Sequence, residues 1–252
     1  MSTPMHTPGH AGGAGQPHAP DPDRASECAS ARLPDPLAAA LRGRMLVFEG
    51  PDGSGKSTQF ARFARAAREA GLAVCEVREP GGTGIGEAVR DLLLAHTHGD
   101  MTLRCEMLLY MASRAQLVEQ TVRPALDRGE LVLADRFVSS TLAYQGAGGG
   151  LPEAEILAVA DAATGGLTPD LVLVFDVDEA TAAARRDAKP DRIESRPAEF
   201  RERVRQSYLE QARRDPDRYA VLDATCAAEG VYDRLLAALA DRFASAARAT
   251  GS

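Results

Sequence analysis

The residues best suited to chemistry stand at positions 49–58, which read EGPDGSGKST and follow the apolar run 45–48. Positions 50–57 fit the pattern G-x-x-x-x-G-K-[ST] between an expected strand and an expected helix. The glycines let successive backbone N–H groups point at one cluster of phosphate oxygens, and the helix adds the positive end of its dipole. Lys56 can neutralise the outer phosphates, and Ser57 offers Mg²⁺ a hydroxyl. We therefore predict a nucleoside triphosphate site made by Gly50, Pro51, Asp52, Gly53, Ser54, Gly55, Lys56, Ser57 and Thr58.

Two further polar motifs follow apolar runs that are typical of strands. Asp135 and Arg136 come directly after the run 131–134. The carboxylate could hold Mg²⁺ through water, and the guanidinium could bind a second anionic group opposite the triphosphate. Because ligands of α/β sheets bind at the carboxyl ends of strands, this position favours a functional pair over a surface salt bridge. Residues 78–83, REPGGT, form a second such motif, and we predict a cis peptide bond between Glu79 and Pro80.

Candidate groups for recognising a flat base lie in two segments. Tyr110 and Arg114 are four residues apart in a predicted helix and so share one face. The ring could stack on a base and the guanidinium could donate to a carbonyl, although a core-edge tyrosine beside a solvated charge would give the same spacing. Residues 139–146, SSTLAYQG, add hydroxyl, phenol and amide groups just beyond Arg136.

The elements that must position these residues alternate along the chain. Short runs rich in Val and Leu, typical of parallel strands buried on both faces, are predicted at 45–49, 73–77, 131–134, 171–176 and 220–223. Amphipathic helices are predicted at 56–70, 84–95, 103–128, 152–164, 199–214 and 229–246. This alternation predicts an α/β fold in three layers: a five-stranded parallel sheet with helices on both faces, joined by right-handed crossovers.

Composition narrows the class of protein. The chain has 252 residues, a net charge of −7 and a pI near 5.3, which argues against a general nucleic-acid binder. It has no apolar run of about 20 residues that could cross a membrane. Four isolated cysteines favour a reduced, cytoplasmic setting. Residues 1–43 are rich in Pro, Gly and Ala, so we expect a disordered tail, a single domain over 44–247 and a frayed end at 248–252.

The motifs FEGPDGSGKST, REPGGT, ADRF, STLAYQG, DRIE and VLDAT, in this order and spacing, closely resemble the bacterial thymidylate kinases, a family of P-loop nucleoside monophosphate kinases. The resemblance runs from about residue 45 to about residue 243. It implies transfer of the terminal phosphate of ATP to dTMP with Mg²⁺, giving dTDP for dTTP supply. It also implies a homodimer with the helix around 103–128 at the contact, and no nucleic-acid or membrane partner.

The resemblance also implies roles for the matching residues. Arg136 would bind the dTMP phosphate, while Asp135 would serve Mg²⁺ together with Ser57 and orient Arg136. Asp52 would lie near the 3′-hydroxyl of the sugar or in the metal shell, and the loop at Thr225 would contact adenine largely through its backbone. The other dTMP-binding residues would be Glu79, Pro80, Arg90, Tyr110 stacking on thymine, Arg114 at a base carbonyl, Thr141 and Gln145 at the base edge, and Tyr144 at the 2′ position of the sugar.

Residues 181–195 resemble the lid of the family. Relatives with an arginine inside the phosphate loop use it on the transferred phosphate, and this loop has none, so the lid should supply the charge. The usual lid has another basic residue near position 187 with a glycine beside it, where this chain has Asp187 and Ala188. A solvated, charged helix end would have the same composition. The basic residue that reaches the transferred phosphate is left open among Arg185, Arg186, Arg192 and Lys189.

Three alternative functions remain at this stage. A kinase for another small acceptor, such as a different nucleoside monophosphate or shikimate, would share the phosphate loop, but the SSTLAYQG run and the Tyr110/Arg114 pair favour dTMP. A GTPase or ATP-dependent switch would bind a partner protein, but the chain contains no N-K-x-D stretch for guanine. An inactive binding protein is disfavoured because Lys56, Ser57, Asp135 and Arg136 are all present.

Overall fold

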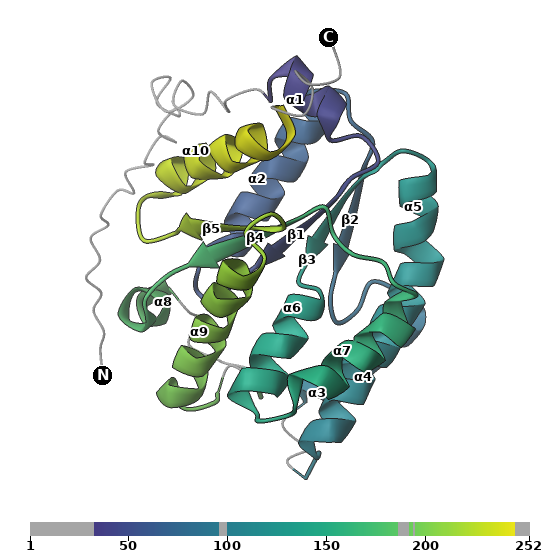
Figure 1. Ribbon diagram of the computed structural model, residues 1–252, viewed down its shortest axis with the longest axis vertical. Helices are drawn as coiled ribbons and strands as arrows, with labels where there is room; N and C mark the ends of the chain where they lie inside the picture. Colours follow the sequence, from purple (N-terminus) through teal and green to yellow (C-terminus); the bar gives the residue numbers. More distant parts are fainter. Residues whose placement is uncertain (1–32, 96–99, 186–191, 194, 245–252) are drawn as a thin grey trace, which may run out of the picture. The chain divides into compact units, whose positions relative to one another are not determined.

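The computed structural model describes residues 33–95, 100–185, 192–193 and 195–244. Five strands form one parallel sheet in the order β2-β3-β1-β4-β5 (Figure 1). Their bounds are β1 Met45–Glu49, β2 Val74–Arg78, β3 Leu131–Asp135, β4 Leu171–Asp176 and β5 Tyr219–Asp223. The central strand β1 pairs with β3 and β4, and all five of its residues are buried, as expected for a strand covered on both faces. The predicted α/β fold is confirmed.

Helices cover both faces of this sheet. One face carries α1 (Asp35–Ala40), α2 (Lys56–Glu69), α10 (Ala228–Leu239) and the π-helix η4 (Ala240–Ala244), which enclose a core around Phe48, Phe63 and Phe175. The other face carries η2 (Val118–Val122), α5 (Arg123–Asp127), α6 (Val138–Thr141), η3 (Leu142–Gly148) and α9 (Ala198–Arg214). The remaining helices are α3 (Gly84–Leu94), α4 (Leu103–Leu117), α7 (Glu153–Thr164) and α8 (Glu179–Arg185).

The helix predicted at 103–128 is interrupted. It consists of α4, the π-helical turn η2 and α5, and Pro124 lies in the first turn of α5. Proline has no backbone N–H and its ring clashes with the carbonyl four residues earlier in an α-helix. A π-helical turn immediately before it accommodates that clash without ending the helix.

The tail boundary expected at residue 43 is wrong. Leu33, Leu37 and Leu41 are at most 2% exposed and pack in the same core as α10 and η4. Their spacing of four residues is that of one helix face, a pattern that the surrounding Pro and Ala content concealed. The rest of the expected tail, residues 1–32, and the expected frayed end lie outside the described residues. Among the described helices, none is both long and apolar enough to cross a membrane.

Candidate active site

The loop between β1 and α2 has the glycines that its path requires. Gly53 has φ +86°, and a Cβ atom there would collide with the backbone of Ala182 in α8. Gly50 has φ +142°, and a Cβ atom there would lie 2.6 Å from the carbonyl oxygen of Phe175. Any side chain at either position would therefore displace the loop from β4 or α8. Gly55, with φ +81°, directly precedes α2, so the start of that helix faces the loop.

Lys56, the first residue of α2, and Asp135, the last residue of β3, form an ion pair. The ammonium is almost fully buried, whereas the Asp135 side chain is 23% exposed. Burial lowers the pKa of Lys56, with a further contribution from the Arg136 charge, and the Asp135 carboxylate opposes both. Asp135 contacts Lys56 directly, and the expectation that it orients Arg136 stays a prediction.

Arg136 is oriented by Asp52, which lies in the glycine-rich loop. The backbone of Arg136 is left-handed, with φ +73°. Among the described residues, Arg136 is the one residue other than glycine with a positive φ. One terminal nitrogen contacts the Asp52 carboxylate, and the other donates to the Gly50 carbonyl at 3.3 Å and the Ser140 hydroxyl at 3.2 Å. The Tyr144 hydroxyl donates to the other Asp52 oxygen at 3.2 Å. The guanidinium is thus held between the phosphate loop and α6.

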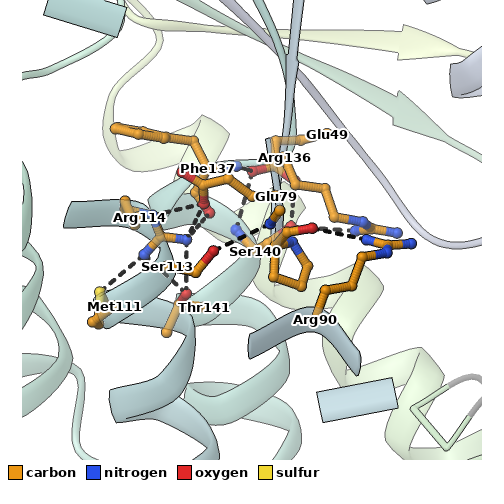
Figure 2. Close-up of polar contacts among 12 residues, drawn as sticks. Glu49, Glu79, Arg90, Met111, Ser113, Arg114, Arg136, Phe137, Ser140 and Thr141 are labelled. Atoms are coloured by element: carbon orange, nitrogen blue, oxygen red, sulfur yellow. Dashed lines mark hydrogen bonds and ion pairs between the residues drawn. The ribbon is translucent and has the colours of Figure 1, made fainter. Parts of the chain in front are cut away.

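The loop after β2 is fixed from behind by α4. The Glu79–Pro80 peptide bond is cis, which confirms that prediction. Glu79 is buried and contacts Arg114, while the Ser113 hydroxyl accepts a 3.1 Å hydrogen bond from Gly81 (Figure 2). Arg90 of α3 donates to the Pro80 carbonyl at 2.9 Å. The loop backbone is therefore held from both α3 and α4.

Arg114 and Tyr110 occupy different environments. Tyr110 lines the cavity described below, but Arg114 is only 1% exposed and does not line it. Its guanidinium donates to the Phe137 carbonyl at 3.0 Å and to the Thr141 hydroxyl at 3.2 Å (Figure 2). It thereby joins the loop at Glu79 to the segment after β3. Its predicted bond to a base carbonyl stays a prediction.

These elements enclose a cavity of about 210 Å³ at the carboxyl ends of the strands. The cationic groups of Lys56 and Arg136 and the aromatic ring of Tyr110 are among the groups that line it. Twelve of the residues predicted from the sequence line it: Asp52, Lys56, Ser57, Glu79, Pro80, Arg90, Tyr110, Asp135, Arg136, Thr141, Tyr144 and Gln145. The other lining residues are Leu94 and three members of segments named in the sequence analysis, Arg78, Ser140 and Ile193.

Comparison with known proteins gives this cavity its context. The family model described as "Thymidylate kinase" matches residues 48–235. The chain belongs to the thymidylate kinase family. The thymidylate kinase of Deinococcus radiodurans is 45% identical over 203 residues, which covers 80% of this chain and 98% of that protein. The thymidylate kinase of Pseudomonas putida is also 45% identical, with 80% and 99% covered. Enzymes of this family phosphorylate dTMP to dTDP with ATP.

A solved structure supports the same conclusion. The crystal structure of thymidylate kinase from Ehrlichia chaffeensis superposes with a TM-score of 0.64 at 31% sequence identity, covering 78% of this chain and 98% of that one. Both aligned relatives and this structure leave about a fifth of the chain unmatched. The family match begins at residue 48, so α1 precedes the matched region.

The lid residues expected from the thymidylate kinase resemblance separate into two groups. Arg186 and Lys189 lie outside the described residues. Arg185, at the end of α8, donates to the carbonyls of Ala224 and Thr225 at 2.7 and 3.1 Å. Arg192 forms a 2.7 Å ion pair with Glu106. In this structure, therefore, neither described arginine is free of protein contacts.

Thr225 lies in the loop after β5, apart from the cavity. Its backbone N–H and hydroxyl both donate to the Asp223 carboxylate, at 3.0 and 2.5 Å. These two bonds are the main reason that the pKa of Asp223 lies below its usual value. The side chain and the backbone N–H of Thr225 are thus engaged locally, and the predicted contact of this loop with adenine stays a prediction.

Sequence reasoning missed three residues that support the site. Glu49, Glu106 and Tyr208 are each at most 2% exposed and bond to residues near the cavity. Glu106 accepts a 2.8 Å hydrogen bond from Gln145, a cavity residue. Glu49 could have been noticed, because a carboxylate at the end of an otherwise apolar strand is expensive to bury without partners. Tyr208 stands about 160 residues further along, and nothing in the sequence links the two.

Proposed function

We propose that this chain transfers the γ-phosphate of ATP to dTMP with Mg²⁺ in the cavity between the phosphate loop and α4. The observation that supports this proposal is that one cavity is lined both by Lys56 and Ser57 of the phosphate loop and by Tyr110 and Gln145. A triphosphate on the loop and a nucleoside monophosphate in the cavity would meet head to head. The acceptor oxygen of a phosphate monoester is already ionised near neutral pH, so alignment and charge neutralisation suffice and no general base is required.

On the acceptor side, Arg136 binds the dTMP phosphate. Its guanidinium lines the cavity and is pre-oriented by Asp52, which lowers the entropy that binding must overcome. Asp52 also faces the sugar. Around the nucleoside, Tyr110 stacks on thymine and Tyr144 faces the 2′ position of the sugar. The other proposed dTMP-binding residues are Glu79, Pro80, Arg90, Arg114, Thr141 and Gln145.

On the donor side, the phosphate loop from Gly50 to Thr58 cradles the phosphates of ATP. Its backbone N–H groups and the start of α2 supply partial positive charge, and Lys56 supplies a full one. The loop at Thr225 contacts adenine. The additional charge on the transferred phosphate comes from the lid residues Arg185, Arg186 or Arg192.

Ser57 and Asp135 are suitable residues for Mg²⁺. Both line the cavity, and Asp135 contacts Lys56, so a carboxylate, a hydroxyl and the phosphate-binding ammonium lie together. Mg²⁺ usually takes only one or two protein oxygens and completes its shell with waters and phosphates, so this sparse donor set fits it. Bound there, the ion would neutralise charge on the phosphates of ATP.

A homodimer and a cytoplasmic location complete the proposal. Large apolar side chains are exposed on neighbouring helices, with Ile85 and Leu92 on α3, Leu108 on α4 and Leu157 on α7. A surface of this kind is typical of a subunit contact. Cys75, Cys105 and Cys226 are free thiols, which suits a reducing compartment.

A coupled ADP-release assay tests the function. With ATP and Mg²⁺, we expect efficient turnover of dTMP and much slower turnover of CMP, GMP and shikimate. Efficient use of CMP or shikimate would contradict the acceptor assignment. ATP hydrolysis that dTMP does not stimulate would contradict the transferase function and favour a nucleotide-dependent switch.

A further inference from the structure

Glu49 is a buried carboxylate at the centre of the sheet. It is the last residue of β1 and is 0% exposed. It does not line the cavity, and the function proposed above gives it no role. A carboxylate buried this deeply is costly unless several donors surround it. The donors around it therefore indicate what it holds in place.

Four hydrogen bonds converge on this carboxylate. One oxygen accepts from the backbone N–H groups of Phe137 at 2.9 Å and Ser140 at 3.1 Å. The other accepts from the Ser140 hydroxyl at 2.7 Å and the Tyr208 hydroxyl at 2.9 Å. Figure 2 shows the contacts to Phe137 and Ser140. Because Phe137 and Ser140 stand at the start of α6, Glu49 caps this helix from another element.

The same groups hold Arg136. Arg136, with its left-handed backbone, comes directly before Phe137, and the Phe137 N–H donates a hydrogen bond to Glu49. Its Nη1 donates to the Ser140 hydroxyl at 3.2 Å and to the Tyr208 hydroxyl at 3.4 Å. The two hydroxyls, 2.9 Å apart, thus connect the guanidinium to the Glu49 carboxylate. Burial raises the pKa of Glu49, while the nearby charge of Arg136 acts in the opposite direction.

We propose that Glu49, acting through Ser140 and Tyr208, is the positioning residue that aims the Arg136 guanidinium at the acceptor phosphate. Glu49 contributes in two ways. It fixes the unusual backbone of Arg136 from the Phe137 side, and it orients the two hydroxyl groups so that their lone pairs face Nη1. This inference rests on the proposed role of Arg136.

The chain offers a matched pair of tyrosines for the test. Tyr208 contacts the hydroxyl of Ser140 at 2.9 Å, and Tyr219 contacts the hydroxyl of the adjacent Ser139 at 2.8 Å. Each Tyr→Phe change deletes one phenol hydroxyl beside the same short helix. Only Tyr208 contacts Glu49 and Arg136. Tyr219→Phe therefore reports the general effect of losing such a bond.

The experiment compares the binding of dTMP with that of thymidine, which lacks the phosphate, to the full chain by calorimetry. We expect Tyr208→Phe and Glu49→Gln to reduce the preference for dTMP over thymidine by about tenfold, the scale of a hydrogen bond that involves a charge. Tyr219→Phe should leave the preference unchanged. If Glu49→Gln does not fold, the comparison of Tyr208→Phe with its control Tyr219→Phe still tests the inference.

Two results overturn the inference in different ways. If Tyr208→Phe lowers the affinities for dTMP and thymidine equally, Glu49 has only a structural role. The same conclusion follows if Tyr208→Phe and Tyr219→Phe change the preference for dTMP equally. Arg136→Ala is measured alongside. If that variant keeps the wild-type preference for dTMP, the proposed role of Arg136 fails first, and the inference fails with it.

Discussion

Arg114 and Glu79 form an ion pair in the interior, with their atoms 2.6 Å apart and their side chains 1% and 3% exposed. The pair joins α4 to the loop after β2, and the remaining guanidinium donors reach the Phe137 carbonyl and the Thr141 hydroxyl. Burial raises the pKa of Glu79, and Arg114 counteracts that shift.

We therefore expect Arg114→Met to lower the free energy of unfolding by about 3–5 kcal/mol, because it leaves the Glu79 carboxylate buried without its partner. Urea denaturation measures this change. The exposed pair of Arg104 and Glu155, whose atoms are 2.7 Å apart, provides the control. Arg104→Met should change the stability by less than about 1 kcal/mol. Similar losses for both variants would contradict the argument from burial.

Arg136→Ala tests the acceptor site directly. Since Arg136 lines the cavity next to the phosphate loop, its loss should lower kcat/KM for dTMP by about 10²–10³-fold, the scale of removing one charge-stabilising donor. The affinity for ATP should stay near the wild-type value. Steady-state kinetics together with nucleotide titration separate the two effects. An equal loss of ATP affinity would show that Arg136 serves the donor instead.

The sequence predicted strands and loops well where residues close together in the chain determine their structure. Strands β1 and β4 have the predicted bounds, and the phosphate loop follows from its glycines and Lys56 alone. The cis bond at Pro80 was predictable because a proline follows a strand end and precedes two glycines. Most cavity residues were found because polar groups that follow buried strands meet at one edge of the sheet.

The connections between those residues were not predictable. The partner of Asp135 is Lys56 and that of Arg136 is Asp52, a choice that depends on the left-handed backbone at position 136. The link between Glu49 and Tyr208 joins β1 to α9, far apart in the chain. Such pairings depend on three-dimensional packing, for which helix and strand periodicity give no signal.

Helix α1 should contribute to stability, although it precedes the part of the chain that matches the family model. Leu37 is 2% exposed in the core shared with α10. Leu37→Ala should lower the free energy of unfolding by about 2–5 kcal/mol. The exposed Ala39 provides the control, since Ala39→Ser removes no buried surface. Equal stabilities in urea would mean that α1 is not required for the core.

Arg185→Ala examines the contact between α8 and the loop after β5. Because its guanidinium donates to the carbonyls of Ala224 and Thr225, we expect the KM for ATP to rise about fivefold, with that for dTMP unchanged. Arg213→Ala, which removes an exposed charge on α9, is the control. A lower kcat at an unchanged KM for ATP would instead assign Arg185 to the transferred phosphate.

Glu87 should make part of the stability depend on pH. Its carboxylate accepts a 2.7 Å hydrogen bond from the Gly82 N–H and pairs with Arg78, and these contacts lower its pKa. A carboxyl whose pKa is lower in the folded state stabilises the protein above its unfolded pKa, and this contribution is lost as pH falls through the folded pKa. Wild type should therefore unfold at a higher urea concentration than Glu87→Gln at about pH 7, and the difference should vanish in acid below the folded pKa of Glu87. A difference that persists unchanged in acid would mean that Glu87 stabilises the loop through contacts that do not require its charge.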